Sequence, residues 1–175
     1  MENNTLYDRQ TALVDANMTW LRQVLEIVKA IDDETFASSP QSLAPHRVGG
    51  HLRHILEFYE CFLDGLTTSH IDYDARKRDE VLEQSRSAAA VKISFLLHRL
   101  ETTLSLRGDC IVWVRMEGYG YLTSSVGREL HVLSSHTIHH FALIAMTLKA
   151  HGVRVDPDFG MAPSTLRYLA RKAAA

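Results

Sequence analysis

The sequence is poor in cysteine and has no long apolar run. Its two cysteines, Cys61 and Cys110, are too few and too isolated for a zinc ribbon or a disulfide framework. No apolar run approaches the ~20 residues that a membrane-spanning helix needs. The first ten residues, MENNTLYDRQ, also lack the basic-then-apolar pattern of a secretory signal. We therefore expect a cytoplasmic protein without a membrane segment.

An excess of basic charge is also absent. Lysine and arginine number 19 against 21 acidic residues, for a formal net charge of −2. The densest charged run, DARKRDE at 74–80, mixes both signs. Nucleic-acid binders usually carry a basic excess or a basic stripe, so no nucleic-acid partner is expected. The length of 175 residues and the 46% hydrophobic content suffice for one domain with its own core, spanning 1–175.

Apolar residues recur at helical spacings of three and four along most of the chain. In the first segment the expected core stripe is Leu13, Ala16, Trp20, Val24, Ile27 and Ile31. The expected helices are 6–33, about 46–66, a third from 85–87 to 104, and a fourth from Ser124 or Ser125, an N-cap, to Gly152, a C′ glycine. A late helical turn is expected at 165–171. Four long helices with modest connections predict a four-helix bundle.

One segment breaks the helical pattern. Ile111 to Val114 are residues that favour a strand, and the GYG sequence at 118–120 can turn the chain back. We therefore predict a short β-hairpin inserted before the fourth helix. The expected fold class is all-α, a four-helix bundle with this insertion.

Ten histidines against four prolines are the unusual feature of the composition. On the fourth helix, His136 and His140 are four residues apart, so their side chains lie on the same face. This spacing allows two imidazoles to hold one metal ion. Histidine pairs also occur as hydrogen-bonded core residues, and spacing alone does not distinguish the two. His139, one residue away, points beside the pair or into a helix interface.

A metal site needs at least one further ligand, and the second helix offers candidates. His51 and His54 are three residues apart and share a face. Helix bundles build metal sites from inward-facing side chains on facing helices. Alternatively, His51 and His54 cap the helix or pair with a carboxylate such as Glu57. The remaining histidines are interpreted as surface or structural residues: His46, His70, His98, His131 and His151.

Two stretches resemble signatures of the DinB/YfiT-like family. The sequence RVGGHLRHIL is similar to that family's second-helix motif, and SHTIHHFALIAMTLKAHGV to its fourth-helix motif, in the same order along the chain. By position, the resemblance implies the metal ligands His54, His136 and His140, with His51 beside the site. Many family members read HHRGQ where this chain has His139 to Leu143, so apolar residues replace polar ones next to the third ligand.

The resemblance implies a metal-dependent enzyme acting on a small molecule. Three imidazoles suit zinc, nickel or iron, and affinity alone does not choose among them. Relatives with an assigned activity use low-molecular-weight thiols, which implies S-transferase or hydrolase chemistry on a small electrophile. No catalytic residue is identified beyond the ligands, and the lack of an evident general base favours thiol transfer.

Other functions remain open at this point. A metal- or ligand-binding stress protein and a dimerisation module share the same fold. Phe141 and Leu143 favour a greasy electrophile if they line a pocket and only pack the core if they do not. Apolar residues assigned to the surface, Leu21, Val28 and Met146, predict a two-fold homodimer.

Overall fold

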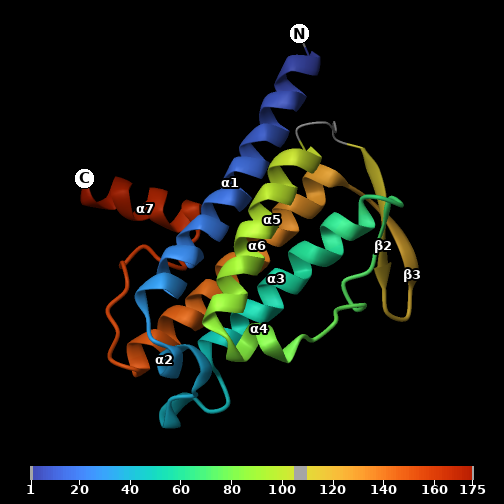
Figure 1. Cartoon of the computed structure of the whole chain (residues 1–175). Helices are drawn as coiled ribbons and strands as arrows, with labels where there is room; N and C mark the ends of the chain where they lie inside the picture. Colours follow the sequence, from blue (N-terminus) through green and yellow to red (C-terminus); the bar gives the residue numbers. More distant parts are fainter. Residues whose placement is uncertain (1, 105–109, 175) are drawn as a thin grey trace.

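The structure is a computed structural model that describes residues 2–104 and 110–174 (Figure 1). Most of these residues lie in helices: α1 (Glu2–Ala30), α2 (Asp33–Ala37), α3 (Val48–Gly65), α4 (Glu80–Gln84), α5 (Arg86–Leu104), α6 (Val126–Ala150) and α7 (Pro163–Ala173), with a 3-10 helix at Gln41–Leu43. Three short strands form one sheet: β1 (His70–Ile71), β2 (Ile111–Met116) and β3 (Gly120–Ser125). The chain is therefore broadly all-α, as the periodicity predicts.

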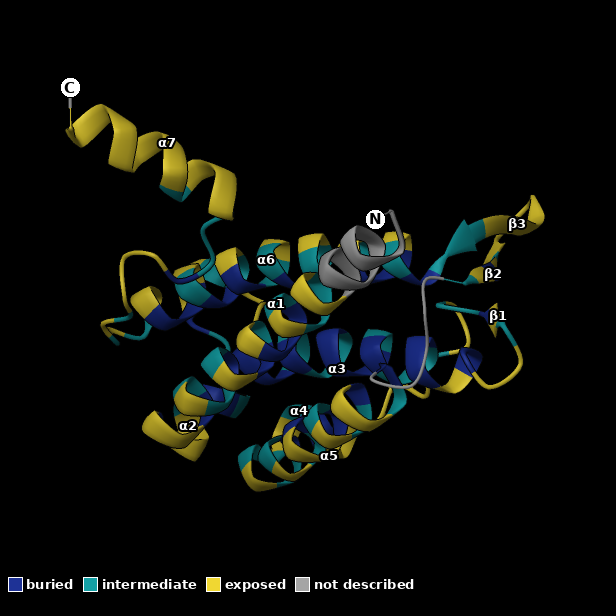
Figure 2. Cartoon of the chain, turned by 90° about the horizontal axis from the view of Figure 1, so that it is seen from above, coloured by how far each residue is buried: buried dark blue, intermediate teal, exposed yellow. Residues whose placement is uncertain are grey.

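The core lies between α1, α3, α5 and α6. Helix α1 packs against α5 and α6, and α3 packs against the same two helices. Figure 2 shows the buried residues on the sides of the helices that face one another. Leu21 and Val28 are fully buried in this core, so their assignment to the surface was wrong. Two helices pack on α1, and its buried face is therefore wider than the single predicted stripe.

The predicted hairpin is present, and a third strand extends it. Strands β2 and β3 pair antiparallel, with Ile111 opposite Ser125 and Met116 opposite Gly120. Gly118 and Gly120 adopt positive φ angles, which allow the tight reversal between the strands. Strand β1 pairs parallel with β2 and places His70 opposite Trp113. This pairing attaches the segment that follows α3 to the hairpin.

The connection between β1 and α4, residues 72–79, is held at both ends. Asp72 Oδ2 lies 2.7 Å from Arg115 Nη1 on β2. At the other end, the Asp79 N–H donates to the buried Glu57 Oε1 over 2.7 Å. Between these anchors, the hydroxyl of Tyr73 donates to Glu129 on α6 over 2.8 Å. The segment is therefore fixed across α3 and α6, the two helices that carry the candidate site.

Helix α4 was not predicted, and it lies very close to the start of α3. A Cβ added at Gly49 would lie 2.1 Å from the backbone oxygen of Glu83 and 2.8 Å from Phe36 Cε1. Only glycine allows this approach of the two backbones. The contact brings the Glu83 side chain beside the first turn of α3.

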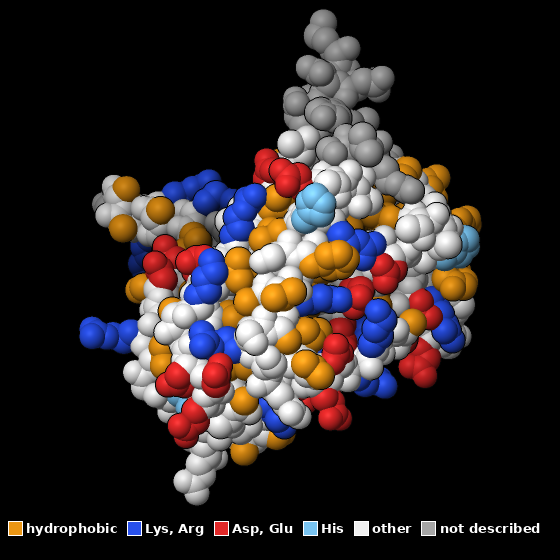
Figure 3. Space-filling model, viewed as in Figure 1, with side chains coloured by type: hydrophobic (Ala, Val, Ile, Leu, Met, Phe, Trp, Pro, Cys, Tyr) orange, Lys and Arg blue, Asp and Glu red, His pale blue; other side chains and the backbone are white. Residues whose placement is uncertain are grey.

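The segment that follows α6 first packs on the core and then turns away from it. Phe159 is buried, and its ring stacks on Phe141 with centroids 4.7 Å apart. Helix α7, longer than the predicted turn, then projects from the other helices with no buried residue (Figure 2). Acidic and basic side chains are interspersed on the face of the molecule in Figure 3. Among the described residues, no helix combines the length and apolar character needed to cross a bilayer.

Candidate metal centre

Helix α6 presents His136 and His140 one turn apart. Its amino end is capped as predicted, because the Ser125 hydroxyl accepts a hydrogen bond from the Arg128 N–H over 3.2 Å. At its carboxyl end, Gly152 adopts a φ of +78°, which suits the predicted C′ glycine. The helix is thus continuous through both histidines, and their ring centroids lie 4.5 Å apart.

Helix α3 adds His54 to this pair. One ring nitrogen from each of His54, His136 and His140 lies within 4.8 Å of the other two. The ring centroid of His54 is 4.8 Å from that of His136 and 4.6 Å from that of His140. The structure therefore brings the three expected ligands into one group, which we call the three-histidine group.

Burial keeps these imidazoles neutral. It lowers the pKa of His54 and His136 to about 4 and that of His140 to about 3, and neighbouring histidines lower each pKa further. The Arg76 cation acts in the same direction on all three. At pH 7 each ring therefore has one nitrogen with a free lone pair, the form that binds metal ions.

Arg76, from the 72–79 connection, determines which nitrogens carry protons. Its Nη1 contacts Nδ1 of His54. A guanidinium only donates, so Nδ1 of the neutral His54 accepts and its proton is on Nε2. That Nε2 lies 3.0 Å from Nε2 of His136, which must then accept. The remaining His136 proton is on Nδ1, which is buried and has no hydrogen-bond partner among the described residues.

Two more histidines, His51 and His46, extend the line of ring contacts from the three-histidine group. Nδ1 of His51 lies 3.1 Å from Nδ1 of His140, and Nε2 of His51 lies 3.1 Å from Nδ1 of His46. His51 thus contacts the nitrogen of His140 that leaves Nε2 available, a contact of the kind that orients a metal-binding imidazole. His139 is exposed, with its ring centroid 5.2 Å from that of His140.

An aromatic stack forms another side of the group. The Phe58 ring stacks on His136 at 4.0 Å and on Tyr73 at 5.0 Å between centroids. The Arg76 guanidinium carbon lies 5.1 Å from the Phe58 centroid, and Arg76 Nε donates to the backbone carbonyl oxygen of Tyr73 over 2.9 Å. These contacts hold Arg76 against the group independently of His54.

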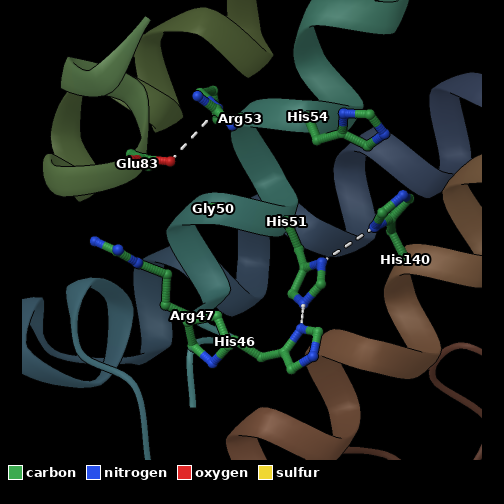
Figure 4. Close-up of a pocket in the computed structure, with 9 residues that line it drawn as sticks. His46, Arg47, Gly50, His51, Arg53, His54, Glu83 and His140 are labelled. Carbon is green, nitrogen blue, oxygen red and sulfur yellow. Dashed lines mark hydrogen bonds and ion pairs between the residues drawn. The ribbon is translucent and has the colours of Figure 1, made fainter. Parts of the chain in front are cut away.

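A pocket of about 420 Å³ opens beside the group. His54 and His140 line it together with His46, His51, Pro45, Gly50, Arg47, Arg53 and Glu83 (Figure 4). Phe141 does not reach this pocket, because it is fully buried against Phe159 and Trp20. Leu143 does not line it either. Phe141 and Leu143 therefore do not form an apolar wall of this pocket.

Several residues of the site escaped sequence analysis. His46 was grouped with the scattered histidines, yet its ring stacks on His51 with centroids 5.2 Å apart. Arg76 lies 22 residues after His54, and no periodic pattern connects the two. Glu57, considered as a histidine partner, accepts instead from the backbone of Asp79. Spacing did not reveal that His51 and His54 on α3 make three ring contacts with His136 and His140 on α6.

The donor set fits a divalent transition metal. Two imidazole nitrogens on one tetrahedral zinc ion, at 2.0–2.1 Å each, are about 3.3 Å apart. The observed 3.0 Å between Nε2 of His54 and Nε2 of His136 is close to that separation. One condition follows: Nε2 of His54 must lose its proton to Nδ1, and Nδ1 then no longer accepts from Arg76.

No protein-family model matches the chain. Among curated proteins, it is similar to FK506-binding protein 5 of Rhizopus delemar, at 32% identity over 108 residues. The matched part is 58% of this chain and 28% of that protein, so the chain spans little more than a quarter of the relative's length. The FK506 binding stated in the relative's name belongs to that protein and is not assigned to this chain.

Proposed function

We propose that the chain is a metal-dependent enzyme of the DinB/YfiT-like kind, in which His54, His136 and His140 hold one zinc, nickel or iron ion. The observation that carries the proposal is the three-histidine group itself, with neutral nitrogens within 4.8 Å of one another beside a pocket. Three protein ligands leave coordination positions for other molecules, which is the arrangement of a catalytic site.

The proposed reaction is transfer of a small thiol to an electrophile. A divalent ion held at the three-histidine group would lower the pKa of a coordinated thiol, whose proton would pass to solvent. The thiolate sulfur would then form a bond to the electrophilic carbon, and the leaving group on that carbon would depart with the electron pair of the broken bond. In this chain, His51 orients His140, and the stack of Phe58 on His136 holds that ring in place. Hydrolysis would need a general base, and the one carboxylate that lines the pocket, Glu83, is paired with Arg53.

The finer fold assignment is part of the same proposal. The mutual packing of α1, α3, α5 and α6 supports a four-helix bundle, with α2, α4, α7 and the sheet as additions. We also propose a two-fold homodimer, on the general prevalence of that symmetry and on the exposure of Met146. Light scattering at micromolar concentration measures the mass, and a monomer mass contradicts the dimer.

The metal assignment is tested by replacing the α6 pair. We expect His136→Ala/His140→Ala protein, purified without a metal-affinity column, to contain no stoichiometric transition metal by mass spectrometry. The wild type should contain up to one ion per chain. His98→Ala, an exposed histidine on α5, is the matched control and should keep wild-type metal content.

Equal metal content in the wild type and the double variant contradicts the assignment. If metal is bound through these residues but no thiol, ester or amide substrate turns over, the protein is a metal-binding protein and the enzymatic part is wrong.

A further inference from the structure

The pocket shares two side chains with the three-histidine group. His54 and His140 form one side of it, while Arg47, Arg53 and Glu83 line other parts (Figure 4). Its volume of about 420 Å³ is in the range of small-molecule sites. A molecule bound in the pocket therefore contacts two of the three proposed metal ligands directly.

The fixed charges in the pocket favour an anion. Glu83 Oε2 lies 3.5 Å from Arg53 Nε and balances that cation. The Arg47 guanidinium has no ion pair or hydrogen bond with any residue that the structure describes. Among the arginine and glutamate side chains that line the pocket, Arg47 is therefore the one without a counter-charge.

Unused hydrogen-bond donors point to the same conclusion. Arg53 Nε is buried and, although it is near Glu83, makes no hydrogen bond within the described part of the chain. A buried N–H without an acceptor is unfavourable, so an acceptor from a ligand would be stabilising. Carboxylate oxygens match the fork of guanidinium donors better than neutral acceptors do.

The dimensions suit a short molecule. Arg47 is the N-cap residue of α3, and its backbone oxygen accepts a hydrogen bond from the His51 N–H over 3.2 Å. Arg47 therefore lies one turn before His51 and about two turns before His54. Arg47 and His54 are about 10 Å apart along the helix axis. Gly50 lies between them, and an added Cβ would be 3.2 Å from Arg47 Cγ and 3.7 Å from Glu83 Oε2. The missing side chain leaves this part of the pocket open.

We infer that the pocket binds a small carboxylate at Arg47 and Arg53. This inference rests on the function proposed above. The carboxylate is one end of the thiol substrate, and the sulfur at the other end of that substrate reaches the three-histidine group. The thiol substrate is then a polar, anionic molecule.

The first experiment separates the pocket from the metal. Sodium succinate is titrated into metal-free protein by calorimetry at constant ionic strength, with inorganic phosphate as a second probe. We expect succinate to bind, and Arg47→Gln and Gly50→Leu each to weaken it by about 10-fold or more. Arg167→Gln, an exposed arginine on α7, removes the same charge and should bind as the wild type. Arg53→Gln is combined with Glu83→Gln, so that the Glu83 carboxylate is not left without its partner.

The second experiment adds the metal. With zinc-loaded protein, mercaptopropionate should bind about 10-fold more tightly than mercaptoethanol, and Arg47→Gln should remove this difference without changing zinc content. Equal affinity of the two thiols in the wild type overturns the inference. So does phosphate binding without succinate binding, or succinate binding that is insensitive to Arg47 and Gly50. If zinc does not bind but succinate binding depends on Arg47, the proposed function fails and the carboxylate pocket stands.

Discussion

Replacing Arg76 should strengthen metal binding, although Arg76 is no metal ligand. The change is Arg76→Met, which keeps the length and packing of the side chain but removes its charge and its donors. The guanidinium donates to His54 Nδ1. Whichever His54 nitrogen binds the ion, that hydrogen bond is lost: Nδ1 is either occupied by the ion or protonated. Metal binding in the wild type must therefore break it.

The cost of breaking this contact sets the size of the effect. A hydrogen bond to a charged group contributes about 1.5–3 kcal/mol, which corresponds to roughly 10- to 150-fold in affinity. Arg76 is only half-buried, so water can partly replace the hydrogen bond that it loses at His54. We therefore expect the lower end, an apparent zinc Kd about 10-fold smaller in Arg76→Met than in the wild type.

A competition titration against a chromogenic zinc chelator at pH 7.5 measures the two affinities. Arg78→Met is the matched control, because Arg78 is exposed in the same connection and should bind zinc as the wild type does. Zinc affinity that is unchanged or weaker in Arg76→Met would refute the reasoning. It would mean that the guanidinium stays with the group when the metal is bound.

Two further predictions concern stability. Burial lowers the pKa of His51, His54 and His136 to about 4 and that of His140 to about 3, whereas an unfolded histidine titrates near 6.5. The unfolded chain therefore binds more protons between these values, and the free energy of unfolding of metal-free protein should fall as the pH drops from about 6.5 towards 4. Thermal melts at pH 7.5 and 5.0 check this, and a pH-independent melting temperature contradicts it. Gly49→Ala should lower the free energy of unfolding by roughly 3 kcal/mol, because its Cβ would overlap the Glu83 backbone. Urea titration beside Gly50→Ala, whose Cβ meets only movable side chains, measures the difference, and equal stability of the two variants is the contrary result.

The long helices could be predicted because their signals are local. Apolar periodicity, the Ser125 cap and the Gly152 stop lie within the segments that they define, and the hairpin was predicted from its own residues. Strand β1 could not be predicted, because two residues form a strand only through pairing with Trp113 and Val114, more than 40 positions away. Leu21 and Val28 were misassigned since the number of helices packed on α1 is a tertiary property.

The residues of the candidate site also fall into those that local patterns predicted and those that they did not. The spacing of His136 and His140 predicted their shared face, but it did not choose between His51 and His54. The resemblance favoured His54, and the structure puts His54 in the three-histidine group and His51 against His140. His46 and Arg76 come from connections whose paths no local rule specifies. That the group binds a metal stays a prediction.

The anchoring of the 72–79 connection determines how the Arg76 side chain can move away from His54. Asp72 is tied to β2, Asp79 to Glu57 and Tyr73 to Glu129, so the backbone that carries Arg76 cannot swing away as a flap. Its guanidinium would leave His54 by rotation about side-chain bonds, and not by a collective movement of the connection. At the proposed metal site, Arg76 should therefore change the equilibrium affinity for the ion without requiring a backbone movement when the ion binds.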